Sequence, residues 1–131
     1  MADQKLQCTV VTPEKSIFDR EATRVTVPAH DGEIGILPGH ARFLARLGVG
    51  EIRVTHDGKT IRLFVEGGFV QVANDRVSVL ADAACALQDI DVNEAAERVD
   101  SLRGTGRGEE FATAKHRHLV MKRVKERFDS S

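Results

Sequence analysis

The 131-residue sequence contains no tryptophan and no tyrosine, and phenylalanine occurs only six times. A hydrophobic core made from this sequence must therefore consist mainly of valine, isoleucine, leucine and alanine. Aromatic rings are also the usual platforms on which proteins stack single-stranded bases, so a reader of single-stranded nucleic acid is disfavoured. The composition, with 41% hydrophobic and 30% charged residues, is instead typical of one compact domain with a small appendage.

Long apolar runs and cysteine are also scarce. No stretch approaches the roughly 20 apolar residues that cross a bilayer, and residues 1–9 resemble neither a signal peptide nor a transit peptide. We therefore expect a cytosol-like compartment. Cys8 and Cys85 stand far apart in apolar surroundings, which favours buried thiols over a disulfide or a metal pair.

The sequence has no Ser/His/Asp or Cys/His set in a recognisable catalytic motif, so we predict a binding subunit with no catalytic residue, no cofactor and no metal site. A small enzyme whose site is assembled from distant residues is the less favoured alternative. His116 and His118 are two residues apart on a predicted helix, where they cannot share a metal ion well. Glycines at 104, 106 and 108 follow a helix instead of a strand, which indicates a hinge and not a phosphate-binding loop.

Up to about residue 80 the sequence predicts short strands separated by Gly, Pro, Asn or Asp turns. The clearest element is a hairpin around Asp57-Gly58, where both turn residues need positive φ and the flanking apolar residues alternate with polar ones. Gly67-Gly68 indicates a bulge or a close backbone approach. The spacing favours an antiparallel sandwich or barrel over residues 1–88. The predicted strands are Leu6–Val11, Thr23–Pro28, Glu33–Leu37, Glu51–Thr55, Thr60–Val65, Phe69–Ala73 and Arg76–Leu80.

From residue 91 the apolar residues recur at helical spacing. Asp91 and Glu94 resemble a capping box, so a first helix is predicted over 91–103 and a second over 109–128. The predicted fold class is therefore mainly β with an α appendage: an N-terminal antiparallel β-sandwich followed by an antiparallel two-helix hairpin over 89–131. The apolar stripe of the second helix consists of Ala114, Val120, Met121, Val124 and Phe128.

The second helix carries the chain's surplus of positive charge. Residues 111–131 have six basic and two acidic side chains, and either a solvated face or a docking surface for an acidic partner explains them equally well. Arg117 falls inside the apolar stripe, so we expect it to snorkel or to pair with Glu94 or Glu97 of the first helix. Phe111 and Leu119 fall opposite the stripe, which is consistent with contact to a partner or with a tilted stripe. The six basic residues are Lys115, Arg117, Lys122, Arg123, Lys125 and Arg127.

The most specific motif is the run DGEIGILPGHA over residues 31–41. Together with the segments TPE at 12–14, FVEGGFV at 64–70 and VSVLAD at 77–82, it closely resembles the epsilon subunit of F-type ATP synthases, over nearly the whole chain. The resemblance implies a β-sandwich with two helices, in a non-catalytic central-stalk subunit that turns with the gamma subunit on the membrane c-ring during proton-driven ATP synthesis. It also implies peripheral attachment to the cytoplasmic face of a bacterial cell membrane, through protein contacts alone and without nucleic acid.

The resemblance also implies roles for particular residues. The loop at Asp31, Gly32 and Glu33 is expected to face the c-ring, whereas Thr12 and His40 are expected to face gamma. The hairpin is similar to a regulatory arm whose six basic residues meet acidic segments of the alpha and beta subunits and inhibit ATP hydrolysis. The alternative from another class of protein is a free-standing β-sandwich adaptor whose basic tail docks on an acidic protein or nucleic acid.

Some members of the family bind ATP through an Ile/Leu-Asp-x-x-Arg-Ala motif. The matching positions here begin at Ile90 and Asp91 and end at Ala95, but Glu94 stands where the motif has arginine. An anion in place of a phosphate-pairing cation reverses the electrostatics, and Arg98 is the neighbouring residue that could substitute. We therefore expect weak or absent ATP binding at this site.

Overall fold

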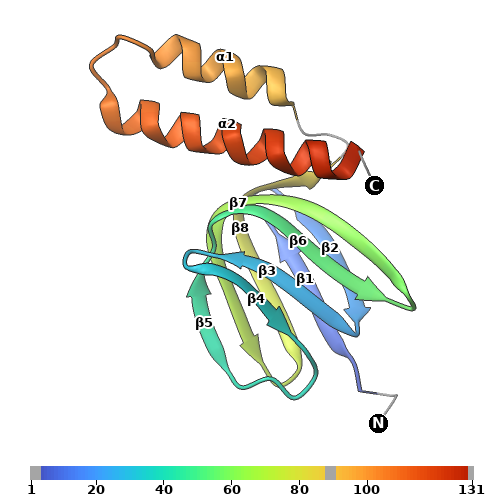
Figure 1. Ribbon diagram of the computed structural model, residues 1–131. Coiled ribbons are helices and arrows are strands. Elements are labelled where there is room, and N and C mark those ends of the chain that lie inside the picture. Colours follow the sequence, from blue (N-terminus) through green and yellow to red (C-terminus); the bar gives the residue numbers. More distant parts are fainter. Residues whose placement is uncertain (1–3, 88–90, 130–131) are drawn as a thin grey trace. The chain divides into compact units, whose positions relative to one another are not determined.

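The computed structural model describes residues 4–87 and 91–129 (Figure 1). The chain separates into two compact units, Met1–Ala86 and Leu87–Ser131. The domain boundary predicted at residue 88 falls outside the described residues.

The first unit is a β-sandwich, as the sequence predicts, and it is built from eight strands. Its strand order is β2-β1-β8-β7-β6-β3-β4, and β5 pairs with β7 outside this path. The long strand β7 belongs to both layers, because it pairs with β6 up to Glu66 and with β5 from Phe69 onwards. The strands are β1 Leu6–Val11, β2 Ser16–Ala22, β3 Arg24–Ala29, β4 Gly32–Ile36, β5 Phe43–Arg46, β6 Val49–His56, β7 Lys59–Ala73 and β8 Arg76–Ala86.

Four details of the sandwich differ from the prediction. Strand β2 was not predicted, because its exposed Asp19, Arg20 and Glu21 hide the alternation of an edge strand. Strand β5 was not predicted either, since four residues are too few to establish a period. Strand β7 runs without interruption through the two strands predicted from 60 to 73. Finally, β1 and β8 pair in parallel, whereas the other strand pairs are antiparallel.

The core of the sandwich is aliphatic, as the shortage of aromatic residues requires. Alternate residues of each strand point inward, such as Val25 and Val27 on β3 and Ile52 and Val54 on β6, and all four are fully buried. Each such side chain contributes roughly 1.5–3 kcal/mol by leaving water. Cys8 is also fully buried, and burial, with a smaller contribution from Asp19, raises the pKa of its thiol to about 12.

Glycines occupy positions of the sandwich where the backbone approaches a neighbouring strand closely or turns with positive φ. A Cβ added to Gly68, which has φ +105, would lie 2.0 Å from the carbonyl oxygen of Leu80, so only glycine fits there. The close backbone approach predicted for this position is confirmed. The predicted hairpin turn is confirmed as well, with φ of 50° at Asp57 and 76° at Gly58.

The second unit consists of α1 (Val92–Leu102) and α2 (Gly108–Asp129), which run antiparallel to each other (Figure 1). Asp91 caps α1 as predicted: its carboxylate accepts a hydrogen bond of 2.9 Å from the amide of Glu94. The helices pack through a small cluster of Val99, Leu102 and Ala114.

Phe111 was predicted to lie opposite the apolar stripe, and this expectation is wrong. Its ring packs against the cluster between the two helices, 5.6 Å below the guanidinium of Arg103. Phe111 lies in the first turn of α2, next to the short connection, where the end of α1 is within reach. Leu119, in contrast, is exposed as expected, and of the stripe Ala114, Met121 and Val124 are buried. The side chain of residue 128 lies outside the description.

Candidate functional site

The loop that matches the ring-facing residues is the tight connection between β3 and β4. Ala29 pairs with Gly32, so His30 and Asp31 form the turn. The amide of His30 donates a hydrogen bond of 2.9 Å to the carbonyl oxygen of Arg46 on β5, which fixes the base of the loop. Asp31, Gly32 and Glu33 are all exposed, and Gly32 has φ +132. A hollow of about 390 Å³ opens beside the loop, between residues 29–34 and 44–46.

Glu33 is tied to the sheet by a residue that the sequence did not single out. Arg53 on β6 places Nη2 3.0 Å from Glu33 and Nη1 3.0 Å from Glu51. The hydrogen bond to Glu51, and then the one to Glu33, raise the pKa of Arg53 above its ordinary value. The three side chains thus form a carboxylate–guanidinium–carboxylate chain.

His40 lies in the loop between β4 and β5. Its amide donates to the carbonyl oxygen of Leu37 at 3.1 Å, and its Nδ1 lies 2.7 Å from the carbonyl oxygen of Ala41, which assigns the ring proton to Nδ1. The imidazole packs against Phe43 with ring centroids 5.1 Å apart. The amide of Gly39 donates a hydrogen bond of 2.7 Å to the carboxylate of Asp75, in the turn between β7 and β8.

Thr12 follows β1 and opens the turn to β2. Its amide and its hydroxyl both donate to the carbonyl oxygen of Lys15, at 2.9 and 3.2 Å. Thr12 and His40 are therefore each held by hydrogen bonds. The turn at Thr12 joins β1 to β2, and the loop at His40 leads into β5.

The apolar strip consists of Leu44, Phe69 and Leu80, which are 68%, 49% and 55% exposed. Phe69 of β7 lies opposite Leu80 of β8, and Leu44 of β5 lies opposite Gln71, one step along the same face. Leu80 in turn lies opposite Val11, the residue before Thr12, whereas Leu44 follows Phe43, which packs against His40. The strip therefore adjoins Val11 beside Thr12, whereas Phe43, which packs against His40, points toward the core on the opposite face of β5.

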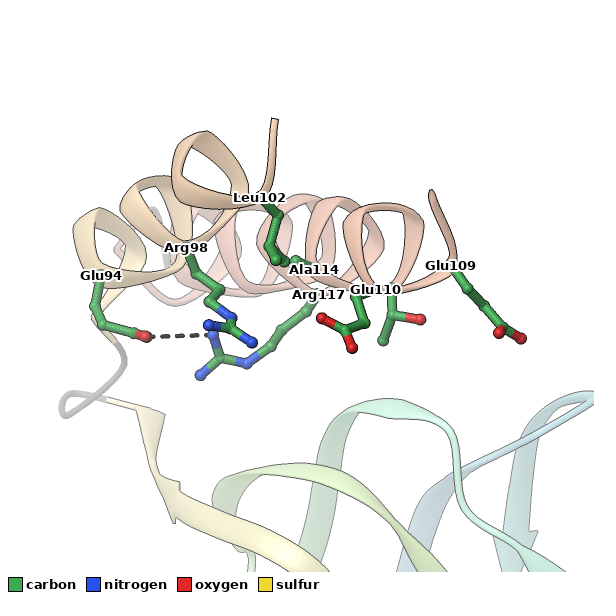
Figure 2. Close-up of a pocket in the computed structure, with 8 residues that line it drawn as sticks. Glu94, Arg98, Leu102, Glu109, Glu110, Ala114 and Arg117 are labelled. Carbon is green, nitrogen blue, oxygen red and sulfur yellow. Dashed lines mark hydrogen bonds and ion pairs between the residues drawn. The ribbon is translucent and has the colours of Figure 1, made fainter. Parts of the chain in front are cut away.

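In the helical hairpin, Arg117 pairs with Glu94 at 3.2 Å, so the pairing predicted from the helical period is confirmed. Both side chains line a groove of about 610 Å³ together with Arg98, Glu109 and Glu110 (Figure 2). The groove therefore combines three carboxylates with two guanidinium groups. Arg98, the predicted substitute for the missing arginine, does reach this groove.

Two other residues of the nucleotide motif have structural roles in the hairpin. The carboxylate of Asp91 is used as the helix cap, and Ala95 is fully buried. Ile90 lies outside the described residues.

The basic residues of the arm do not share one environment. Arg117 lies half-buried in the groove and Lys125 is also half-buried, whereas Lys115, Lys122, Arg123 and Arg127 are exposed. Leu119 is exposed on the same helix. The exposed surface of α2 thus carries these four cations, the carboxylates of Glu109, Glu110 and Glu126, and one large apolar side chain.

Among residues 4–87 and 91–129, no helix is long and apolar enough to cross a membrane. The same described residues contain no cluster of three or more His, Cys, Asp or Glu side chains arranged for a metal ion. The two cysteines are not joined by a disulfide, and Cys85 is only half-buried, in contrast to the buried thiol expected.

Comparison with known proteins identifies first the class of domain. The family model described as "ATP synthase, Delta/Epsilon chain, beta-sandwich domain" matches residues 5–86, which are the described sandwich. The chain is also similar to a chain in a cryo-EM structure of the central stalk and c-ring of the Tetrahymena thermophila mitochondrial ATP synthase. The TM-score is 0.68 over 93% of this chain and 97% of that one, at 14% identity, so this likeness concerns the fold alone.

Two bacterial relatives define the family more narrowly. The ATP synthase epsilon chain of Pelotomaculum thermopropionicum is 38% identical over 95 residues, covering 72% of this chain and 71% of that one. The epsilon chain of Symbiobacterium thermophilum is 46% identical over 98 residues, covering 74% and 69%. The chain belongs to the ATP synthase epsilon-chain family, a non-catalytic part of the enzyme, as its sequence motifs predict.

Proposed function

We propose that this chain is the central-stalk subunit that connects gamma to the c-ring of a bacterial-type ATP synthase, at the cytoplasmic face of the membrane. The observation that carries the proposal is the apolar strip of Leu44, Phe69 and Leu80, on the face that also bears Val11, the residue before Thr12. Membership of the epsilon-chain family supports it.

The apolar strip is proposed as the attachment surface for gamma. Phe69 and Leu80 are direct cross-strand neighbours, and Leu44 lies diagonally across from Phe69 beside Arg46, on the same sheet face. A group of large hydrophobic side chains that are about half exposed or more commonly marks a protein contact. Burial of each in an interface contributes up to roughly 1.5–3 kcal/mol. The turns at Thr12 and His40 border the strip and are rigid enough to define its edges.

The exposed loop of Asp31, Gly32 and Glu33 is proposed to face the c-ring. It stands on a rigid hairpin whose base is bonded to β5, so that it can hold its shape against lateral force. Because Leu44 lines the hollow beside this loop, the ring-facing and gamma-facing surfaces adjoin each other.

The helical arm is proposed to restrain ATP hydrolysis through its exposed cations at Lys115, Lys122, Arg123 and Arg127, which would meet acidic segments of the alpha and beta subunits. Several cations on one helix can meet several carboxylates at once. Exposed pairs contribute only ~0–1 kcal/mol each and are screened by salt, so such a contact can form and release.

The test uses a cognate F1 assembly stripped of this chain, with binding and ATP hydrolysis measured on adding it back. Replacing Leu44 and Phe69 by serine is expected to abolish binding without unfolding the sandwich, because both side chains are already exposed. Leu119→Ser changes a leucine outside the strip that is 51% exposed, close to the 49% of Phe69; it is the matched control and should bind normally.

Replacing Lys115, Lys122, Arg123 and Arg127 by glutamine should preserve binding but relieve inhibition. If this variant inhibits as strongly as the natural chain, the arm is not the inhibitor. If the natural chain does not bind F1 at all, the central-stalk proposal fails and the free-standing adaptor replaces it.

A further inference from the structure

The connection between Glu33 and the sheet extends the ring-facing proposal. Glu33 on β4 and Arg53 on β6 belong to strands that flank β3: Glu33 lies opposite Pro28, and Arg53 opposite Thr26. The guanidinium of Arg53 therefore reaches across β3 to meet Glu33, with Nη2 and Oε2 3.0 Å apart.

The other end of the guanidinium is fixed from within the sheet. Nη1 of Arg53 donates a hydrogen bond of 3.0 Å to Oε1 of Glu51. The Glu51 side chain is 7% exposed, that of Arg53 29% and that of Glu33 54%, so the chain of charges runs from a buried carboxylate to an exposed one. A buried carboxylate requires a partner, which holds Arg53 in this rotamer.

A planar guanidinium transmits this constraint in a way that an ammonium group does not. Once Nη1 is fixed on Glu51, the rigid plane of the guanidinium directs Nη2 toward Glu33. Glu33 lies in β4 between Gly32 and Ile34, and its side chain is 54% exposed, so packing against other side chains restrains it little. The orientation of its carboxylate is therefore set largely by Arg53.

We propose that Arg53, anchored by Glu51, is a positioning residue for the ring-facing loop: it holds the Glu33 carboxylate in the single orientation that meets the c-ring. The inference rests on the proposed function, which assigns Asp31, Gly32 and Glu33 to the ring contact. The energetic advantage is that the carboxylate is ordered before contact, so its rotamer entropy is not lost during each encounter.

The test compares variants in the assembled ATP synthase, with ATP-driven proton pumping and ATP hydrolysis measured on the same membranes. Glu33→Gln and Arg53→Lys should each lower the pumping per ATP hydrolysed while hydrolysis persists. Pumping per ATP hydrolysed should be no lower in the double variant than in the worse single variant, because the effects of substitutions within one ion-pair network are not additive. Arg24→Lys, the same replacement at an exposed arginine of neighbouring β3, is the matched control and should pump normally.

Arg53→Lys retains a positive charge beside Glu51, and thermal unfolding of the full chain checks that it folds. If it does not, Glu51→Ala provides a second variant, since it removes the inner anchor but keeps both Arg53 and Glu33. It should lower pumping to the same extent as Arg53→Lys.

Each of the other outcomes overturns either the positioning role of Arg53 or the ring-facing assignment of Glu33. If Glu33→Gln lowers pumping but neither Arg53→Lys nor Glu51→Ala does, the positioning role is wrong and the ring contact stands. If the losses from Glu33→Gln and Arg53→Lys simply add, Arg53 acts through general stability and the positioning role is again wrong. If Glu33→Gln has no effect on pumping, the ring-facing assignment itself fails, and the inference fails with it.

Discussion

The carboxylate of Asp75 accepts a hydrogen bond of 2.7 Å from the backbone amide of Gly39, which lies 36 residues earlier in the chain. Asp75 also accepts a hydrogen bond from the amide of Gln7 through its own carbonyl oxygen, at 2.9 Å. One residue of the β7–β8 turn therefore joins the start of β1 to the loop that carries His40.

The tether between Asp75 and Gly39 can be removed without straining the turn. Asp75 has φ 59, which glycine and asparagine adopt readily, so Asp75→Gly deletes only the acceptor and Asp75→Asn retains one. Asp75→Gly should lower the free energy of unfolding by about 1–2 kcal/mol and accelerate hydrogen exchange at the Gly39 amide. In Asp75→Asn the Gly39 amide should retain most of its protection against hydrogen exchange. Equal exchange rates in all three chains would show that the tether does not order the loop.

The ion pair between Glu94 and Arg117 should stabilise the helical hairpin modestly. Their side chains are 52% and 26% exposed, so the coupling energy from a double-mutant cycle of Glu94→Gln and Arg117→Met should not exceed about 1 kcal/mol. Methionine keeps the aliphatic stem of Arg117 in place. Thermal unfolding followed by helical circular dichroism measures the cycle, and the coupling should disappear in about 1 M salt.

The matched control for this cycle pairs Glu94→Gln with Lys122→Met, which removes an exposed cation further along α2. This pair should be additive. A coupling energy between Glu94 and Lys122 as large as that between Glu94 and Arg117 would mean that Glu94 interacts with the charge of the whole helix and not with one partner.

ATP should bind the full chain weakly or not at all. Glu94 holds Arg117, and the groove contains three carboxylates against two guanidinium groups, so a polyphosphate would enter a negative environment. Isothermal titration calorimetry should show no binding in the sub-millimolar range. Glu94→Arg, which restores the cation of the motif and releases Arg117, should increase the affinity. Sub-millimolar binding by the natural chain would contradict this prediction.

The Cys8 thiol should make the stability of the sandwich depend on pH in alkaline solution. Its pKa rises from 9.0 to about 12 because burial disfavours the thiolate, so the native state binds this proton more tightly than the unfolded state does. The contribution is complete below about pH 9 and is lost as the pH rises toward 12, at up to about 1.4 kcal/mol per pH unit.

Urea unfolding at several alkaline pH values measures this slope. Cys8→Ala removes the titrating group, so its free energy of unfolding should fall less steeply over the same range. The absence of tyrosine simplifies the comparison, since no phenol titrates in this window. Parallel slopes for the two chains would show that the thiol is accessible to solvent or ionises without unfolding.

Local features of the fold followed from the sequence because their causes lie within a few residues. The hairpin turn at Asp57-Gly58 depends on two adjacent residues that accept positive φ, and the cap at Asp91 depends on an amide three residues away. The pairing of Arg117 with Glu94 was predictable too, because two helices joined by a short turn bring their apolar stripes together. The residues of the ring-facing loop and Thr12 and His40 came from the resemblance.

The residues that organise those loops were decided by tertiary structure. Asp75 meets Gly39, and Arg53 meets Glu33, only because β7, β6, β3 and β4 pair in one particular register, and a shift of one residue would turn each side chain to the other face. The parallel pairing of β1 with β8 has the same origin. Hydrophobic alternation determines which face of each strand is buried, but it does not specify which strand becomes its neighbour; that choice depends on packing of the whole sandwich.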